Sequence, residues 1–342
     1  MHELTRFSAL EMAALWRGNR RRLAEDHLRG QAQASGRPSH LKIELTNFCN
    51  LACPLCPHPQ MRREVGYMRP ELFRRIIDEA APELEFAYLH HLGESLFHAR
   101  LGELIRYGRS RGAAMGLSTN ATFLDAKKSR ILLDSGLDFL VISVDGATPA
   151  TYERMRVGAD FATTVANVRA LFAQKRTVPN HTAVVVQMIV TPLNRHEIDD
   201  FAAQWEGDGA QVMIKEARDW AGQVRLERPV SPPPVAGPCK LPWTELTILW
   251  DGAVVPCANF TERTHAVGDL ASQSLDEIWN GPALAQLRAA HAADAVAAVP
   301  ICAGCPRQPF DHADFVALDQ LALRRRTYLR PTGDHSPRPG LS

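Results

Sequence analysis

Short apolar segments alternate with longer amphipathic ones through residues 41–216, which predicts strands separated by helices. Six segments have the length and the β-branched or apolar content of buried strands: Leu41–Thr46, Phe86–Leu92, Ala114–Thr119, Phe139–Asp145, Thr182–Thr191 and Val212–Glu216. Five segments between them have helical spacing: Pro70–Ala80, Leu101–Arg111, Leu124–Leu133, Phe161–Lys175 and Arg195–Trp205. This alternation predicts parallel strands with crossover helices, in an open sheet or a partial barrel, and a functional site at the carboxyl ends of the strands.

The pattern changes outside this region. Residues 1–30 are expected to be helical. Val230–Pro238 contains three consecutive prolines and is predicted to be a linker. Beyond it, the Asp251-Gly252 turn predicts a β-hairpin between Thr244–Trp250 and Ala253–Val255. Two further helices are expected, at Leu275–Trp279 and Pro282–Ala290, before a tail rich in proline and glycine.

Composition places few limits on the partners of the protein. At 342 residues, the chain is long enough for one large domain and a smaller module. The net charge is only +1, so it favours neither nucleic acid nor an anionic membrane as a partner. The sequence has no apolar run long enough to span a bilayer and no signal-peptide pattern at its start. We therefore expect a cytoplasmic protein.

Seven cysteines carry the most specific chemical signal. Their odd number and tight spacing favour metal ligation over disulfide bonds. Cys49, Cys53 and Cys56 lie in one loop directly after the first predicted strand. Iron–sulfur clusters are normally held by four cysteines, so three ligands would leave one iron open to a substrate or cofactor. A zinc site that borrows a fourth ligand, or a chance spacing, is the alternative, although zinc sites usually use paired Cys-x2-Cys units.

The cysteine loop and several later segments resemble the radical S-adenosylmethionine (SAM) superfamily. Gly93-Glu94-Ser95 is similar to the family motif that binds the SAM amino group, with serine where proline is usual. Ser118-Thr119-Asn120 and Ser143-Val144-Asp145-Gly146 are similar to two further family segments. The resemblance implies a set of residues that contact SAM: Gly93, Glu94, Ser118, Asn120, Ser143, Asp145, Arg156 and Gln187.

The resemblance also implies cofactors and a mechanism. A [4Fe–4S] cluster on Cys49, Cys53 and Cys56 would bind SAM through its open iron. One electron from the reduced cluster would cleave SAM to a 5′-deoxyadenosyl radical, which removes a hydrogen atom from the substrate. The protein then positions the substrate and excludes water. An external one-electron donor, of the flavodoxin or ferredoxin type, is an implied partner.

The remaining four cysteines are Cys239, Cys257, Cys302 and Cys305. They and their flanking segments resemble the SPASM/twitch extension of radical SAM enzymes, which implies one auxiliary [4Fe–4S] cluster with every iron ligated. A structural zinc ion fits the same four ligands. Because all seven cysteines would then be ligands, no free thiol remains to return a hydrogen atom to a substrate radical. Epimerisation is therefore disfavoured, and a fully ligated cluster suits electron transfer.

Four polar residues at the predicted strands are candidate catalytic or substrate-contacting residues, because burying a polar group without a partner is costly. Glu44 alternates with apolar neighbours and is expected to face the lumen or solvent. His90 ends the second strand, and Lys215 and Glu216 end the sixth. Internal salt bridges or exposed strand-end charges are the alternatives. A lumen of this kind favours a small polar substrate, such as a sugar, an aminocyclitol or a nucleoside.

We therefore expect an α/β protein, with a partial (β/α)6 TIM-type barrel and a small C-terminal iron–sulfur extension of the SPASM/twitch type. The expected divisions are an N-terminal helical segment (1–40), the barrel (41–229), the extension (230–315), and a C-terminal helix with a flexible tail (316–342).

The leading functional hypothesis is a radical SAM oxidoreductase that dehydrogenates a carbohydrate-like natural-product intermediate. One alternative is a lyase that decarboxylates a sugar acid in nucleoside antibiotic biosynthesis. Peptide maturation is another, although residues 1–40 are too short for the N-terminal recognition domain that peptide-modifying relatives usually carry. The last alternative is a non-enzymatic metal-binding or electron-transfer protein.

Overall fold

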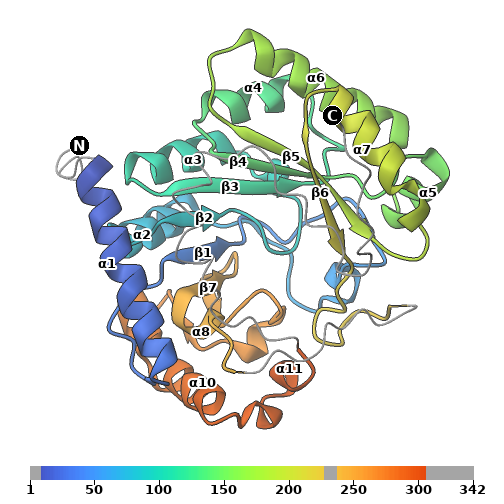
Figure 1. Cartoon of the computed structure of the whole chain (residues 1–342). Helices are drawn as coiled ribbons and strands as arrows, with labels where there is room; N and C mark the ends of the chain where they lie inside the picture. Colours follow the sequence, from blue (N-terminus) through green and yellow to red (C-terminus); the bar gives the residue numbers. More distant parts are fainter. Residues whose placement is uncertain (1–8, 227–236, 306–342) are drawn as a thin grey trace, which may run out of the picture.

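The computed structural model describes residues 9–226 and 237–305. Its strands form a nine-stranded sheet in the order β6-β5-β4-β3-β2-β1-β7-β8-β9 (Figure 1). The strands are β1 (His40–Ile43), β2 (Phe86–Tyr88), β3 (Ala114–Thr119), β4 (Phe139–Ser143), β5 (Ala183–Val190), β6 (Gln211–Glu216), β7 (Glu245–Ile248), β8 (Ala253–Val255) and β9 (Gly268–Asp269).

The first six strands confirm the predicted partial barrel. Each strand from β1 to β6 is parallel to the next one along the chain. The outermost strands, β6 and β9, are not paired with each other, so the barrel is open in the described part of the chain. Parallel strands joined by crossover connections place their carboxyl ends on one rim, and this rim carries the candidate site.

Helices follow the barrel strands, and Figure 1 shows α2, α3, α4, α6 and α7 along the outer side of the curved sheet. Buried apolar side chains such as Ile76, Leu104 and Phe201 belong to the main core. The sequence pattern did not reveal α5, because seven residues are too few to show a helical period. The α-helices are α1 (Ala9–Leu28), α2 (Pro70–Ala80), α3 (Leu101–Ser110), α4 (Ala126–Asp134), α5 (Pro149–Met155), α6 (Phe161–Thr177), α7 (Ile198–Gly207), α8 (Leu241–Thr244), α9 (Leu275–Trp279), α10 (Pro282–Ala292) and α11 (Pro300–Ala303).

The second predicted strand is longer than the observed one. Strand β2 ends at Tyr88, whereas the apolar pattern continues to Leu92. The chain leaves the strand conformation before Gly93, whose φ of +85° is accessible to glycine but strained for other residues. Polar residues after Tyr88 therefore lie in a loop at the carboxyl rim and not in the sheet.

The predicted hairpin forms, and it extends the barrel sheet. Gly252 adopts a φ of +98° in the turn, and the N–H of Leu249 donates to the carbonyl of Ala253 at 2.9 Å. Strand β7 then pairs in parallel with β1 through four register positions, from His40 opposite Glu245 to Ile43 opposite Ile248. The extension is therefore continuous with the barrel, an arrangement that local sequence patterns did not indicate.

Helix α1 packs against both parts of the chain. Arg20 of α1 forms an ion pair with Glu85, just before β2. On the other side, the Trp243 indole donates to the carbonyl of Gln31, in the loop after α1, at 2.8 Å. Most of the proline-rich segment 230–238 and the whole of the expected C-terminal helix and tail (316–342) lie outside the described residues. Across the described ranges, no helix is both long and apolar enough to cross a membrane.

Candidate active site and cluster sites

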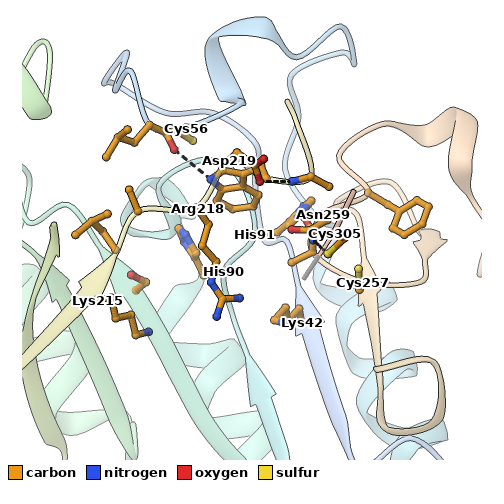
Figure 2. Close-up of a pocket in the computed structure, with 18 of the residues that line it drawn as sticks. Lys42, Cys56, His90, His91, Lys215, Arg218, Asp219, Cys257, Asn259 and Cys305 are labelled. Carbon is orange, nitrogen blue, oxygen red and sulfur yellow. Dashed lines mark hydrogen bonds between the residues drawn. The ribbon is translucent and has the colours of Figure 1, made fainter. Parts of the chain in front are cut away.

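A cavity of about 1040 Å³ lies at the carboxyl rim of the barrel (Figure 2). Tyr88 of β2, Ser118 of β3 and Gln187 of β5 reach it from the barrel side. Alternate residues of a strand face opposite sides of the sheet, so one side chain in two is available to this lumen. Pro256 and Ile301 line the cavity from the extension. The volume is at the upper end of the usual range for ligand pockets, which is about 300–1,000 Å³.

The first cysteine set lies in the loop after β1. Cys53 and Cys56 line the cavity, and the N–H of Cys56 donates to the carbonyl of Cys53 at 3.1 Å. Burial, followed by nearby charges that include Cys53, raises the pKa of Cys49 to about 11. Burial, followed by the thiolates of Cys53 and Cys49, raises the pKa of Cys56 to about 12. The three sulfurs therefore lie within electrostatic reach of one another, and the positively charged irons of a bound cluster would relieve their mutual repulsion.

Arg156 joins this cysteine loop to the end of β4. One guanidinium nitrogen lies 2.6 Å from Asp145 Oδ2, and another donates to Cys53 Sγ at 3.8 Å. Burial raises the pKa of Asp145, and the positive charge of Arg156 offsets this only in part. The third nitrogen, Nε, is buried with no hydrogen-bond partner in the described chain. A buried cation with one unused donor beside Cys53 fits an anionic cluster or a ligand carboxylate.

The Gly93-Glu94 motif packs directly against the cysteine loop. A Cβ atom at Gly93 would collide with the backbone of Thr46 and Asn47, so only glycine fits between the two loops. The Glu94 carboxylate accepts from the Thr119 hydroxyl at 2.9 Å and from the Asn120 N–H at 2.7 Å. Burial raises the pKa of Glu94, and these donors lower it in part. Glu94 thus ties the motif to the segment that follows β3.

The predicted SAM contacts divide into two groups. Five of them line the cavity: Ser118, Ser143, Asp145, Arg156 and Gln187. The other three do not line the cavity and instead hold the cysteine loop against the segment that follows β3: Gly93, Glu94 and Asn120. The Asn120 side chain donates to the Asn50 side chain at 3.1 Å, which again fixes the cysteine loop.

The second cysteine set faces the same cavity from the extension. Cys239, Cys257, Cys302 and Cys305 all line it, and none of the seven cysteines of the chain is in a disulfide. Burial raises the pKa of Cys257 and Cys305, and Cys239 raises both further. Asn259 donates to Cys305 Sγ at 3.1 Å, a contact that suits a thiolate.

A zinc ion and an iron–sulfur cluster would place different demands on these four sulfurs. Within residues 9–226 and 237–305, no three His, Cys, Asp or Glu side chains converge closely enough to hold one metal ion. A structural zinc site needs four ligands around a single ion. A polynuclear cluster joins sulfurs that lie further apart than the ligands of a single ion.

Glu44 does not have the position expected from the sequence. It is fully buried, does not line the cavity, and forms a two-pronged ion pair with Arg63, with both N–O distances at 2.8 Å. It also lies 3.2 Å from His91 Nδ1. The other ring nitrogen of His91 lies 3.0 Å from the carbonyl of Ala258, next to Cys257. Glu44 is therefore an internal ion-pair partner that connects the barrel to the extension. The expected substrate contact of Glu44 is corrected to this internal role, because Glu44 does not line the cavity.

The other three candidate substrate contacts line the cavity: His90, Lys215 and Glu216. Burial, followed by the charge of His91, lowers the pKa of His90 to about 4, so its imidazole is neutral at pH 7. Glu216 is paired with Arg195 at 2.7 Å, which matches the strand-end ion pair considered as an alternative. Arg218, which the sequence indicated only as a neighbour of Lys215, lies in the loop after β6 and also lines the cavity.

The segment after β6 connects the two cysteine loops. The Trp220 indole donates to the carbonyl of Leu55, beside Cys56, at 3.1 Å (Figure 2). The Gln223 amide donates to the carbonyl of Asn259 at 2.6 Å. Trp220 and Ala221 adopt φ values of +53° and +58°, which are uncommon for residues other than glycine. The backbone is thus held in an unfavourable conformation where it spans both sites.

Comparison with known families follows the same division of the chain. The sequence model of the radical SAM superfamily matches residues 43–204. The model of the SPASM iron–sulfur cluster-binding domain matches residues 239–306. The chain therefore belongs to the radical SAM superfamily and carries a SPASM-type extension. Its cofactors are SAM, a SAM-binding [4Fe–4S] cluster and an auxiliary iron–sulfur cluster.

Three curated relatives illustrate the range of the family. A tungsten-containing aldehyde ferredoxin oxidoreductase cofactor-modifying protein of Pyrococcus furiosus is 26% identical, over 70% of this chain and 80% of that protein. A PqqA peptide cyclase of Streptomyces rochei is 26% identical, over 72% of this chain and 76% of that protein. The mycofactocin maturase MftC of Mycobacterium ulcerans is 29% identical, and the match spans 53% of this chain and about half (48%) of that relative.

Solved structures share the fold at low identity. Streptococcus suis SuiB bound to the precursor peptide SuiA superposes with a TM-score of 0.64 at 13% identity, over 79% of this chain and 71% of that chain. BtrN in complex with AdoMet and 2-DOIA superposes with a TM-score of 0.54 at 17% identity, over 78% of this chain and 92% of that chain. At these identities the likeness shows the architecture alone.

Proposed function

We propose that this radical SAM enzyme modifies a peptide. Two relatives, named as a peptide cyclase and a maturase, support a peptide over the sugar-like substrate favoured by the sequence. The observation that carries the proposal is the cavity of about 1040 Å³ shared by the two cysteine sets, which would hold the substrate together with SAM and both clusters. The Pyrococcus furiosus relative is named for modifying a cofactor, so the substrate class needs a direct test.

The residues divide the proposed chemistry between them. Cys49, Cys53 and Cys56 would hold the SAM-binding cluster, and the four cysteines of the extension would hold the auxiliary cluster. When bound, SAM and the first cluster would supply a radical that removes a hydrogen atom from the substrate, and the auxiliary cluster would supply a one-electron partner.

The protein itself would position the substrate and exclude water. Ser143, Gln187 and Arg156 line the strand side of the cavity and would orient SAM. The neutral imidazole of His90 would form a hydrogen bond to the substrate. Trp220, anchored on the first cysteine loop, would limit the access of water to the space between the two cysteine sets.

Oxidation of a small polar molecule is the second candidate. Polar side chains on the strand side of the cavity favour it, because a hydrophilic substrate could satisfy them. The full use of the cysteines as ligands also disfavours reactions that need a thiol hydrogen donor. Both observations are compatible with a peptide that enters the cavity by one polar side chain.

The test is anaerobic turnover of the reconstituted enzyme with dithionite and SAM. We expect 5′-deoxyadenosine in the wild type and none in the Cys49→Ala, Cys53→Ala, Cys56→Ala variant. Pools of short peptides and pools of sugars, aminocyclitols and nucleosides are then compared by mass spectrometry. Uniformly deuterated peptides should transfer deuterium into 5′-deoxyadenosine. Transfer from the small-molecule pool alone would replace the peptide proposal, and a cluster-replete protein that makes no 5′-deoxyadenosine would refute both.

A further inference from the structure

Two positive side chains face the cavity without a counter-ion. Lys215 and Arg218 both line the cavity. In the chain from 9 to 226 and from 237 to 305, neither side chain forms a hydrogen bond or an ion pair. Glu216, which lies between them in sequence, is paired with Arg195. Asp219 also lines the cavity, but it accepts from the N–H of Ala221 and forms no ion pair with either cation. Cations in a ligand cavity normally have an anionic partner, and neither Lys215 nor Arg218 is paired with one here.

The two charges are close to each other and to the second cysteine set. Burial lowers the pKa of Lys215, and the charge of Arg218 lowers it further. Arg218 and Cys305 line the same cavity, Arg218 from the loop after β6 and Cys305 from the extension. An anion bound here would remove the repulsion between the two cations.

A third group on this side of the cavity also has no partner. His90 Nδ1 is buried and forms no hydrogen bond in the described chain. Figure 2 shows His90, Lys215 and Arg218 on one side of the cavity, across from Cys257 and Cys305. A neutral imidazole can donate from one ring nitrogen, so His90 adds a hydrogen-bond donor beside the two cations.

The backbone that carries Arg218 is anchored at both cysteine loops. Trp220 donates to the carbonyl of Leu55, and Gln223 donates to the carbonyl of Asn259. The positive φ values of Trp220 and Ala221 persist because these contacts hold the segment in place. Arg218 is thus presented to the cavity from a fixed loop, which lowers the entropy cost of binding a ligand.

We propose that Lys215 and Arg218 bind a carboxylate of the substrate and so place its reacting carbon between the two cysteine sets. Arg218 offers a planar pair of donors that matches a carboxylate, and Lys215 adds a second charge. The inference rests on the proposed function only in that the substrate enters this cavity. A peptide would supply an acidic side chain, and a small molecule would supply an acid group on its ring.

The test is equilibrium binding to the reconstituted enzyme with SAM present, by isothermal titration calorimetry at low salt. The probes are N-acetyl-glutamate and the neutral N-acetyl-glutamine. We expect binding of the acid to weaken about tenfold or more in Lys215→Met and in Arg218→Met, from the loss of one charge-assisted contact. Lys127→Met, on exposed α4, removes the same charge far from the cavity and should not change binding. The amide probe should bind more weakly than the acid to the wild type.

Further arms identify the source of the carboxylate. The blocked peptide N-acetyl-Gly-Glu-Gly-amide and glucuronate are compared as probes. The probe that binds more tightly, and whose binding weakens in Lys215→Met and Arg218→Met, indicates the substrate class. Arg218→Lys should restore part of the binding that Arg218→Met loses, which a folding defect would not. Lys127→Met should keep the wild-type SAM affinity and the wild-type 5′-deoxyadenosine formation without substrate, and SAM affinity is measured in parallel for both methionine variants.

Two results would overturn the proposal. One is equal affinity of N-acetyl-glutamate for the wild type and both methionine variants. The other is a matching loss of SAM binding in the Arg218→Met variant, which would assign the cations to the carboxylate of SAM. If the enzyme makes no 5′-deoxyadenosine but still binds the acid through Lys215 and Arg218, the proposed function fails and the carboxylate site remains.

Discussion

The buried ion pair between Glu44 and Arg63 allows a quantitative prediction. The Glu44 side chain is fully buried, and that of Arg63 is 5% exposed. Arg63 also donates to the carbonyl of Thr261 in the extension at 2.7 Å. Replacing Arg63 with methionine would leave the Glu44 carboxylate buried with only His91 and the Trp250 N–H as partners.

The expected cost follows from the titration of Glu44. Burial alone would raise the pKa of Glu44, but hydrogen bonds from His91 and Arg63 more than offset it, and the pKa falls from 4.5 to about 2. A shift of this size corresponds to about 3 kcal/mol, to which both His91 and Arg63 contribute. Loss of one partner from a buried pair costs about 3–5 kcal/mol in other proteins. We therefore expect Arg63→Met to lower the free energy of unfolding by about 3 kcal/mol.

The assay is anaerobic urea unfolding of the reconstituted protein at pH 7. The matched control is Arg62→Met, which removes an exposed neighbouring charge and should change stability by less than about 0.5 kcal/mol. The double variant Glu44→Gln, Arg63→Met should be more stable than Arg63→Met alone, because it removes the stranded charge. If Arg63→Met and Arg62→Met unfold at the same urea concentration, the pair does not stabilise the fold and the reasoning is wrong.

Three further predictions concern the cofactor sites and pH. The variant with Cys49, Cys53 and Cys56 changed to alanine should retain about four irons per chain on the auxiliary site; zinc in place of iron would contradict the cluster assignment. Arg156→Gln should lower the reduction potential of the first cluster in an EPR-monitored titration, because a positive charge beside Cys53 is lost; an unchanged potential would contradict this. The pKa of His90 is lowered to about 4, so the unfolded state binds more protons between about pH 6.5 and 4. As the pH is lowered through that window, the free energy of unfolding should fall, and Tm with it. His90→Gln should make this fall in Tm shallower; an unchanged slope of Tm against pH would contradict a buried neutral imidazole.

The barrel could be predicted from the sequence because its signals are local. Each strand is a short apolar run, and each main helix repeats its apolar face over several turns. The pairing of β7 with β1 could not be predicted, because it joins residues about two hundred positions apart and no pattern in either strand specifies the partner. Helix α5 was too short to detect.

The site was predictable where chemistry depends on residue type and spacing. The cysteines, and the glycine at position 93, follow from such requirements. Glu44 shows the limit of this reasoning: alternation along a strand indicates a side chain's face but not the partner that meets it. Arg63 pairs with Glu44 from an irregular loop, where no periodic signal exists. The sequence placed Arg218 beside Lys215, but only the structure brings it to the same cavity as the extension.

The parallel pairing of β7 with β1 has a mechanical consequence. Backbone hydrogen bonds join β1, which leads into the first cysteine loop, to β7, the first strand of the hairpin whose second strand, β8, ends just before Cys257. Since the rate of electron tunnelling falls steeply with distance, a spacing set by one shared sheet makes that rate insensitive to thermal motion between the parts. The two redox centres would then exchange electrons across a fixed gap, without waiting for a domain to swing.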